Sequence, residues 1–558
     1  MAGTILTPTT IWKDFEISIP SAQKVDEKND GKVLTEHIFI DGKEEKGGKT
    51  QIFGVFTRNA DGKKAPAILF LRDFENSGDD ALVLEFVKRG YSVLSIDLKG
   101  KTDDSEYFTV YPECVNYANY SVAKESLDKV EKEATDTCWY EWVCNARYAL
   151  KYLSSLPFVT KVGGLGMGEA ATVMWQVAGC DKNLSCAVFV LNAGWKGYRG
   201  IHKFAGNVEP QFSDNMYKYI AGIEPQAYAM HVSCPTLMLS ATNSNKYDCD
   251  RASDTIARIS DGVFKSLHYS VGYRERVSGE AFRVANIFLE EFLKKNTGKL
   301  KADVDIACEI KNKKIEIFVS VDGDVKGVEL YASEEIHNPA KRCWQMVCGG
   351  KKVDGGYVFE YSPYHKSSQA SFFAQVTYKN GFVAGTKIIN KKFTEKEVLP
   401  SHKCKILYSS RTCGAESIFS AAHQFTETKT QVNIEDKKRI EVKKGPLGIE
   451  GVSCEWGLLT FKFATAKDRP IDGSILITDV YAPTNGTFTV KLISDYFGAK
   501  IEYLASVNLL GGDVWQNVKF EINKFKTAEG MGLRSYDKIE AIEFTSDVEF
   551  IINNALWV

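Results

Sequence analysis

The chain has 558 residues and carries 70 Lys and Arg against 72 Asp and Glu, so its formal net charge is −2. Hydrophobic residues make up 44% and charged residues 25%, which is the balance of an ordinary globular protein. A charge so near neutrality gives no electrostatic basis for binding nucleic acid or an anionic membrane surface. No stretch reaches the length of about 18 apolar residues that a transmembrane helix needs, so we expect no membrane partner.

The cysteines and the N-terminal segment bear on the compartment. The 13 cysteines are odd in number and include no Cys-x-x-Cys pair. We therefore predict free buried thiols in a reducing compartment, and no metal or other cofactor. The first 20 residues lack a basic segment followed by an apolar run, so they do not have the pattern of a signal peptide. Both features favour a cytoplasmic location; secretion is the alternative if a signal peptide has been removed.

The first of three predicted domains covers residues 1–297. After alternating strand patterns in residues 1–60, short apolar runs alternate with amphipathic helical segments. The apolar runs are 65–74, 91–100, 161–164, 186–194 and 234–242, and the helical segments are 79–90, 138–156 and 281–295. Buried strands that alternate with helices predict a mostly parallel sheet covered on both faces, and so an α/β domain.

Two all-β domains are predicted to follow. Residues 298–396 alternate polar and apolar side chains between Gly and Asn turns, which is typical of an immunoglobulin-like sandwich. Residues 400–558 are again rich in strand patterns, and their length fits a jelly-roll-like sandwich. Asn485-Gly486 lies between two of these patterns and predicts a hairpin turn. With Thr487 it also matches a glycosylation acceptor, but nothing else indicates secretion.

The turn at residues 164–168 is the central motif of the first domain. Its sequence Gly-Leu-Gly-Met-Gly has the frame of Gly-x-Ser-x-Gly, the strand-to-helix turn that presents a nucleophilic serine. In this frame Gly166 takes the position of the serine, and it has no side chain to act as a nucleophile. A phosphate-binding loop is the alternative for a glycine-rich turn before a helix. The segment does not, however, match Gly-x-x-x-x-Gly-Lys-[Ser/Thr].

Segments around this turn resemble the acetyl-xylan-esterase-like α/β-hydrolases. The matching segments are IDLKGK (96–101) with YPEC (111–114), the helical segment 139–157, CAVFVLNAGWKGYRG (186–200) and YIAGIEPQAYAMHVSCPTLMLSATNS (219–244). They occur in the family's order over about two-fifths of the chain. The resemblance implies an α/β-hydrolase fold and, in active members, a serine, an acid and a histidine.

The catalytic positions that the resemblance implies are changed here. Ser244 stands where the family has its acid, with Asp248 and Asp250 nearby as substitutes that would need a loop shift. The loop that should carry the histidine contains Glu275 and no histidine, and we interpret the neighbouring His268 as a structural residue inside a strand. Losing one triad member already costs several orders of magnitude in rate. We therefore do not expect a working serine esterase.

The loop after the first buried strand also departs from the family. Arg72-Asp73 stands where members commonly have His-Gly, so the loop that should supply an oxyanion-binding N–H is altered. With the triad changes, this makes a catalytically inactive, esterase-like pseudo-hydrolase the first hypothesis. Such a protein would serve as a binding scaffold or as a structural, self-assembling homo-oligomer.

Carbohydrate is the candidate ligand of this scaffold. The C-terminal segment FIINNALWV resembles the last strand of carbohydrate-binding jelly-roll modules. Sugar binding needs exposed aromatic rings beside polar side chains, whereas Trp and Tyr are also common in cores. The candidate ligand-binding residues are Trp456, Tyr481, Tyr496, Tyr503 and Trp515.

The second hypothesis is a hydrolase of the carbohydrate esterase class with a non-standard or displaced active site. Carboxylates about 5–10 Å apart can perform general acid/base chemistry. The candidates are Asp73, Asp103, Asp104, Glu169 and Glu275. The alternative for Glu169 is that it complements the dipole at a helix start. A nucleophilic Cys or Ser elsewhere has no sequence signature in its favour.

Overall fold

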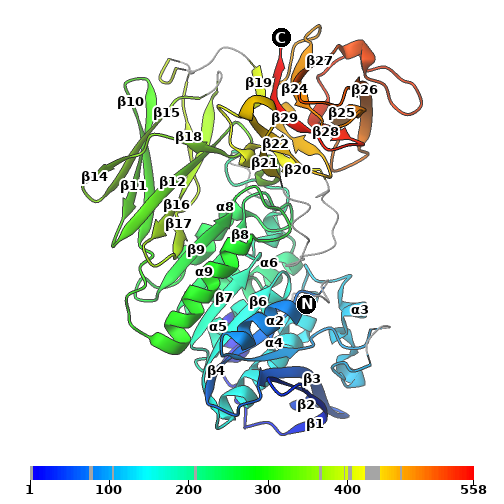
Figure 1. The fold of residues 1–558 in the computed structure, drawn as a ribbon. Coiled ribbons are helices and arrows are strands. Elements are labelled where there is room, and N and C mark those ends of the chain that lie inside the picture. The colour runs from blue at the N-terminus through cyan, green and yellow to red at the C-terminus, as the bar shows by residue number, and fades with distance from the viewer. Residues whose placement is uncertain are drawn as a thin grey trace.

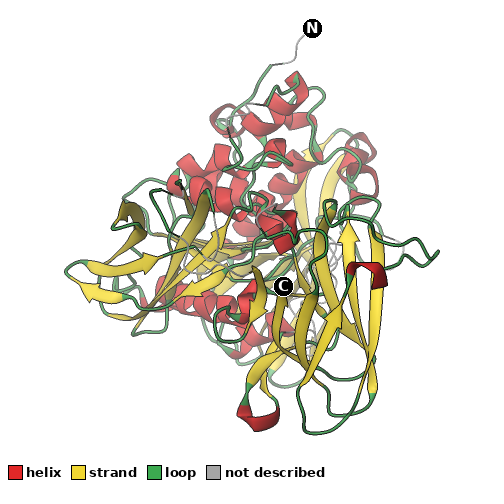
Figure 2. Ribbon diagram, turned by 90° about the horizontal axis from the view of Figure 1, so that it is seen from above, coloured by secondary structure: helices red, strands yellow, loops and turns green. Residues whose placement is uncertain are grey.

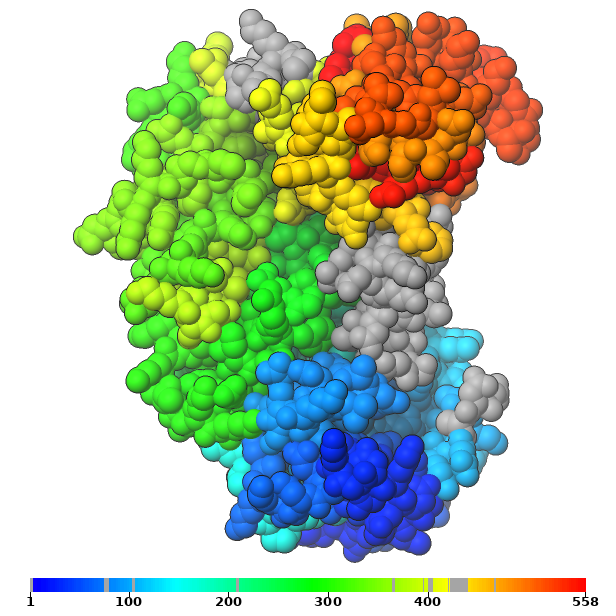
Figure 3. Space-filling model, in the orientation of Figure 1, coloured from blue at the N-terminus to red at the C-terminus, as the bar shows by residue number. Residues whose placement is uncertain are grey.

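A computed structural model describes residues 4–74, 80–102, 106–206, 210–363, 367–394, 396–399, 405–421, 440–465 and 468–558. The chain forms an α/β unit followed by two β-rich units, which lie next to each other at one end of the molecule (Figure 1). The space-filling view shows the N-terminal strands at the opposite end (Figure 3). No helix in the described part of the chain is long and apolar enough to span a membrane.

The α/β unit is built on a nine-stranded sheet with the order β1-β2-β3-β5-β4-β6-β7-β8-β9. From β5 to β9 the neighbouring strands are parallel, whereas β1, β2 and β3 are antiparallel to their neighbours. The parallel arrangement predicted from the apolar runs is therefore present. The strands are β1 (Ala22–Asn29), β2 (Val33–Glu45), β3 (Gly48–Asn59), β4 (Ala65–Leu71), β5 (Ser92–Ile96), β6 (Val159–Met167), β7 (Cys186–Val190), β8 (Thr236–Ala241) and β9 (Lys265–Ser270).

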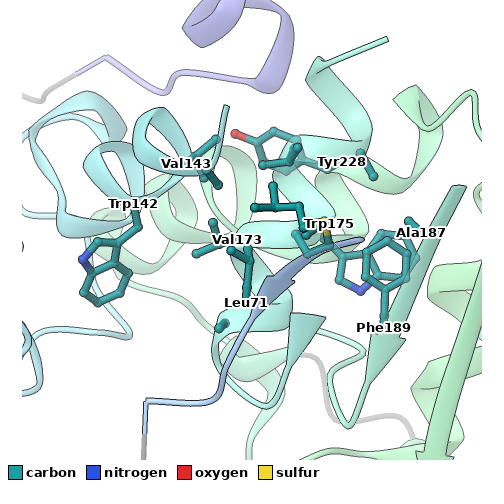
Figure 4. Packing of buried hydrophobic residues seen from close by; sticks show 14 of the residues in the cluster. Leu71, Trp142, Val143, Val173, Trp175, Ala187, Phe189 and Tyr228 are labelled. Carbon is teal, nitrogen blue, oxygen red and sulfur yellow. The ribbon is translucent and has the colours of Figure 1, made fainter. Parts of the chain in front are cut away.

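Helices cover both faces of this sheet (Figure 2). Alternate residues of β4 face two separate cores: Leu69 and Leu71 belong to one, and Ile68 and Phe70 to the other. On the first face Trp175 stacks on Phe189 at 3.6 Å between ring centroids (Figure 4). The helices are α1 (Pro8–Trp12), α2 (Asp80–Lys88), α3 (Tyr120–Ala123), α4 (Cys138–Ser155), α5 (Ala170–Cys180), α6 (Asp214–Gly222), α7 (Pro225–Tyr228), α8 (Cys249–Ala257) and α9 (Gly279–Leu289).

The second unit has two antiparallel sheets with the orders β10-β11-β15-β14 and β13-β12-β16-β17, and β18 pairs with β16. Apolar side chains from both sheets enter one core, so the unit is a two-layer arrangement of strands. The strands are β10 (Val304–Lys311), β11 (Lys314–Val321), β12 (Val325–Glu334), β13 (Gln345–Val347), β14 (Lys351–Val353), β15 (Gly356–Tyr361), β16 (Gln369–Tyr378), β17 (Val383–Gly385) and β18 (Ile389–Lys392).

The third unit also has two sheets. A six-stranded sheet has the order β21-β22-β29-β24-β27 with β19 beside β29, and a five-stranded sheet has the order β20-β23-β28-β25-β26. The strands are β19 (Lys405–Ser409), β20 (Phe419–Ser420), β21 (Glu441–Lys444), β22 (Glu450–Ser453), β23 (Leu458–Thr460), β24 (Leu476–Tyr481), β25 (Gly486–Ser494), β26 (Ile501–Leu509), β27 (Gln516–Phe520), β28 (Ile539–Ser546) and β29 (Ile551–Trp557).

The hairpin predicted at Asn485-Gly486 is wrong. These residues do connect two consecutive strands, but β24 belongs to the six-stranded sheet and β25 to the five-stranded sheet. The connection therefore crosses between the two layers instead of folding a strand back on its neighbour. The Asn485 side chain stabilises this crossing, because its Oδ1 accepts a hydrogen bond from the Gly511 N–H at 2.7 Å.

Candidate functional site

The turn between β6 and α5 lies two residues later than the sequence indicated. Gly166 is inside β6 and pairs with Leu71 and Phe189 on the neighbouring strands. The residue at the tip is Gly168, with φ +54°, a backbone conformation that favours glycine. The prediction that Gly166 forms the tip is therefore wrong. A nucleophile in this turn would stand at the position of Gly168.

Asp73 fills the space that a side chain at this tip would need. A Cβ on Gly168 would lie 2.3 Å from the Asp73 carboxylate. The Glu169 N–H, on the residue after the tip, donates to Asp73 Oδ1 at 3.2 Å. In an active elbow this N–H is one of the donors that bind the oxyanion. A buried carboxylate thus takes both the nucleophile's volume and one oxyanion-binding donor.

The Glu169 side chain is the anionic centre of a buried charge cluster. Its carboxylate contacts the Lys196 ammonium and lies 3.6 Å from Lys246 Nζ. Burial on its own would raise the pKa of Glu169, but the two ammonium groups outweigh it and lower the pKa. Glu169 is therefore held as a carboxylate by fixed countercharges. This arrangement is suited to structure more than to proton transfer.

Lys196 is positioned by a second buried acid. The carboxylate of Glu224 accepts hydrogen bonds from the backbone N–H groups of Trp195 and Gly197, on either side of the lysine. Gln226 also accepts from the Trp195 N–H, at 3.2 Å. Burial raises the pKa of Glu224, and the donors around it act in the opposite direction. The loop after β7 therefore presents Lys196 to Glu169 in a fixed orientation.

The structure brings together the two residues at the acid and base positions. Ser244 Oγ donates to the Glu275 carboxylate, at 3.4 Å to each oxygen, and the Asn245 N–H donates to Glu275 at 3.2 Å. Burial raises the pKa of Glu275 despite these donors. The loops after β8 and β9 thus meet as they would in a triad. A hydroxyl and a carboxylate stand there in place of an acid and a histidine.

The same two loops bind the other units of the molecule. Asn243 Nδ2 donates to the carbonyls of Pro339 and Arg342 in the second unit, at 3.0 and 2.7 Å. Arg274, beside Glu275, is buried with its guanidinium 4.5 Å from the ring centroid of Phe419 in the third unit. The loops that would carry an acid and a base therefore contribute to contacts between units.

The group Asp248, Cys249 and Asp250 has a spacing that could hold a metal ion, but the Asp250 carboxylate is already paired. The Asp250 carboxylate and the Arg342 guanidinium are fully buried and form two parallel contacts of 2.5 and 2.7 Å. A guanidinium that occupies both carboxylate oxygens leaves no good ligand for a cation. This pair links α8 to the second unit.

Other predicted site residues have simpler environments. His268 lies inside β9 as expected, is fully buried, and burial lowers its pKa to about 3. Asp103 and Asp104 lie outside the described residues. Most of the 12 cysteines of the described part are buried. The lysines of the cluster, Lys196 and Lys246, were missed by the sequence reasoning, because no motif distinguishes them from surface lysines.

The five aromatic candidates do not form one site. Tyr496 is buried and Tyr503 is half-buried on β26, whereas Trp456 is exposed on the turn before β23. Tyr481 and Trp515 lie together on the six-stranded sheet, with ring centroids 6.0 Å apart. Only this pair of the described candidates has its rings in mutual contact at a surface.

The sheet order, with parallel strands from β5 onward and a strand–turn–helix at β6, defines an α/β-hydrolase fold for the first unit. No family model matches the chain, and no curated protein matches it.

Solved structures with a similar fold include three esterases. Acetyl xylan esterase from Paenibacillus sp. R4 is 13% identical with a TM-score of 0.38, covering 51% of this chain and 92% of that one. Acetyl xylan esterase 1 from Thermoanaerobacterium sp. JW/SL YS485 is 13% identical with a TM-score of 0.38, and the match covers 52% of this chain and 96% of that one. A cold-adapted esterase from an Arctic intertidal metagenomic library is 14% identical with a TM-score of 0.33, and the match covers 49% of this chain and 100% of that one. Similarity at this level transfers no activity to the chain.

Proposed function

We propose that this chain is a catalytically inactive, esterase-like protein whose α/β-hydrolase unit is a structural platform for an immunoglobulin-like and a jelly-roll-like sandwich. The observation that carries the proposal is the Gly168 turn, where the Asp73 carboxylate lies 2.3 Å from the place of a side-chain Cβ. A nucleophile needs that volume, and an oxyanion needs the Glu169 N–H that Asp73 uses.

The contacts between units support the same proposal. Asn243, Asp250 and Arg274, all in or beside the loops of the acid and base, contact the second or third unit. In an enzyme these loops must leave room for a substrate. Here they are used to fix the sandwiches on the sheet. The scaffold would serve carbohydrate binding or assembly of a homo-oligomer, in a cytoplasmic setting.

The alternative is a hydrolase of the carbohydrate esterase class with a displaced site, and it would use the carboxylates near the turn. Glu169 and Glu275 are both close to Lys246, so the charges are clustered. Each is already occupied, however, Glu169 by lysines and Glu275 by Ser244 and Asn245. A general acid or base must be free to exchange a proton with a substrate.

Hydrolysis of a small aryl acetate by the purified chain tests the two functions. We expect no rate above buffer for the unmodified protein and no labelling by a serine-reactive fluorophosphonate. The double variant Asp73→Gly/Gly168→Ser restores a hydroxyl at the tip with room around it. We expect labelling to stay absent, because Glu275 and not a histidine stands at the position of the base. Hydrolysis by the unmodified chain that Glu169→Gln or Glu275→Gln abolishes would establish the alternative.

A further inference from the structure

We propose that the outer face of the six-stranded sheet in the third unit is a binding site for a neutral glycan. Tyr481 and Trp515 would contact the apolar face of a sugar ring, and Asp479 with Asn517 would bind its hydroxyl groups. The choice of a glycan as the ligand rests on the proposed function, whereas the location of the site follows from the register of the strands. The surface belongs to β24, β27 and β29 (Figure 1).

The strand register places these side chains on one face. In β24, Leu476 and Val480 point into the core, so Asp479 and Tyr481 point outward. Asn517 of β27 is paired with Asp479, which puts Trp515 beside Tyr481 two residues further along. Residues two apart on a strand are separated by about 6.6 Å. The aromatic pair and the polar row therefore lie about one sugar ring apart.

The aromatic pair is held in position without a ligand. The two rings are 6.0 Å apart at an angle of 56°, and both are half-buried. Trp515 Nε1 donates to the Pro446 carbonyl at 3.1 Å, and the indole ring packs against Gly445 so closely that a Cβ there would lie 2.6 Å from it. Rings fixed in advance lose little conformational entropy on binding.

The polar row offers both acceptors and donors. Asn517 and Asn554 donate to the two oxygens of Asp479, at 2.8 and 3.1 Å. Each carboxylate oxygen can accept a second hydrogen bond, and Asn517 has a further amide hydrogen and a carbonyl oxygen. Neighbouring hydroxyl groups of a sugar can therefore donate to Asp479 and accept from Asn517. Polar groups that fix orientation beside an aromatic surface are typical of small-ligand sites.

The charge of the face favours a neutral glycan over a protein partner. Lys519 follows Asn517 on the outward side of β27, so one positive and one negative charge lie on this face. Exposed apolar side chains border the aromatic pair: Leu447 is 93% exposed and Val514 is 52% exposed. An apolar protein surface would bury the polar row without partners at a cost in free energy. Sugar hydroxyls supply those partners.

Affinity electrophoresis of the full chain in gels containing soluble xylan or soluble β-glucan tests the proposal. We expect at least one polysaccharide to retard the unmodified protein. We expect Tyr481→Ala and Asn517→Ala each to weaken the affinity about tenfold, the size of one good contact. Tyr503→Ala and Trp456→Ala, which change aromatics elsewhere in the third unit, are the matched controls. Circular dichroism checks that each variant is folded.

Several results would overturn the inference. No retardation by either polysaccharide would exclude glycan binding at this face, and retardation unchanged by both Tyr481→Ala and Asn517→Ala would place it elsewhere. A homo-oligomer in sedimentation that Tyr481→Ala dissociates, without retardation, would make the face a protein interface. None of these outcomes depends on esterase activity, so the failure of this site and the failure of the proposed inactivity are distinguishable.

Discussion

Gly168 and Asp73 share one small volume at the end of β6. The glycine adopts φ +54°, and the carboxylate takes the space beside it. Two independent penalties therefore oppose a side chain at residue 168: the left-handed backbone and the collision with Asp73.

A double-mutant cycle separates these two penalties. We expect Gly168→Ala to lower the free energy of unfolding by about 2–4 kcal/mol, from backbone strain and overpacking. In an Asp73→Gly background the same substitution should cost only about 1–2 kcal/mol, because the strain remains and the collision does not. Urea denaturation of the four proteins measures both values. Equal costs in the two backgrounds would show that Asp73 does not fill the space.

His268 gives the molecule a pH dependence of known sign. Its pKa is about 3 in the folded chain, mainly because of burial, against about 6.5 in an unfolded one. Between these values the unfolded state binds one proton more, so stability is lost as the pH falls from about 6.5 towards 3, by up to about 1.4 kcal/mol per unit. We expect His268→Leu to reduce the dependence of the free energy of unfolding on pH, as measured by urea denaturation between pH 4.5 and 7. Parallel profiles for both proteins would contradict the assignment.

At this scale the sequence identified the turn but not its tip. Glycines at 164 and 168 frame Gly166 as the motif requires, whereas a tip at Gly168 is framed by Gly166 and Ala170. Only the length of β6, which extends to Met167, shows that the tip is Gly168. The pairing of Ser244 with Glu275 followed from family positions. The lysines around Glu169 come from loops after β7 and β8, and only the assembled sheet brings them there.

The loops after β8 and β9 connect sheet strands to neighbouring units. Their main anchor is the buried pair between Asp250 at the start of α8 and Arg342 in the second unit. A buried charge without its partner is far more costly than the pair is favourable.

We expect Arg342→Met to lower the free energy of unfolding by about 3–5 kcal/mol, because the Asp250 carboxylate would stay buried and unpaired. The double variant Arg342→Met/Asp250→Leu should recover most of that loss, since no charge is then buried. Lys379→Ala is the matched control: its pair with Asp324 is exposed and should contribute less than about 1 kcal/mol. Additive losses in the double variant would show that the two residues do not depend on each other.

Among the elements, the strands β4 to β8 of the first unit followed from the apolar runs, and α2, α4 and α9 lie where helical periodicity predicted them. The error at Asn485-Gly486 has a physical cause. A turn sequence specifies a change of direction, whereas the partner of each strand depends on contacts distant in sequence.

The three units of the molecule are joined by contacts that no local pattern reveals. Arg274 reaches from the loop after β9 to Phe419 and Phe461, with its guanidinium 4.5 and 5.7 Å from their ring centroids. Lys341 of the second unit pairs with Glu540 of the third at 3.1 Å. The third unit is thereby fixed to both of its neighbours.

We expect Arg274→Ala to loosen this attachment. The variant should shift part of the calorimetric unfolding to a lower temperature, as a separate transition of the third unit, because buried cation–π contacts of about 2 kcal/mol are lost. The control Arg283→Ala removes an exposed arginine from the first unit, to which Arg274 also belongs. It should leave the calorimetric unfolding without a separate transition of the third unit. A profile of Arg274→Ala that matches the control would mean that other contacts hold the third unit in place.

The two ends of the nine-stranded sheet are protected in different ways. The edge strand β1 carries four charged residues among its eight, a pattern that discourages further strand addition. The strand at the other end, β9, carries only Lys265, and the second unit covers it: Gln375 accepts from the Tyr269 N–H at 2.9 Å, and Gly385 lies against the Tyr269 ring. A chain cut near residue 297 would bare an almost uncharged strand edge and should aggregate. The second unit thus shields this edge of the sheet from other chains.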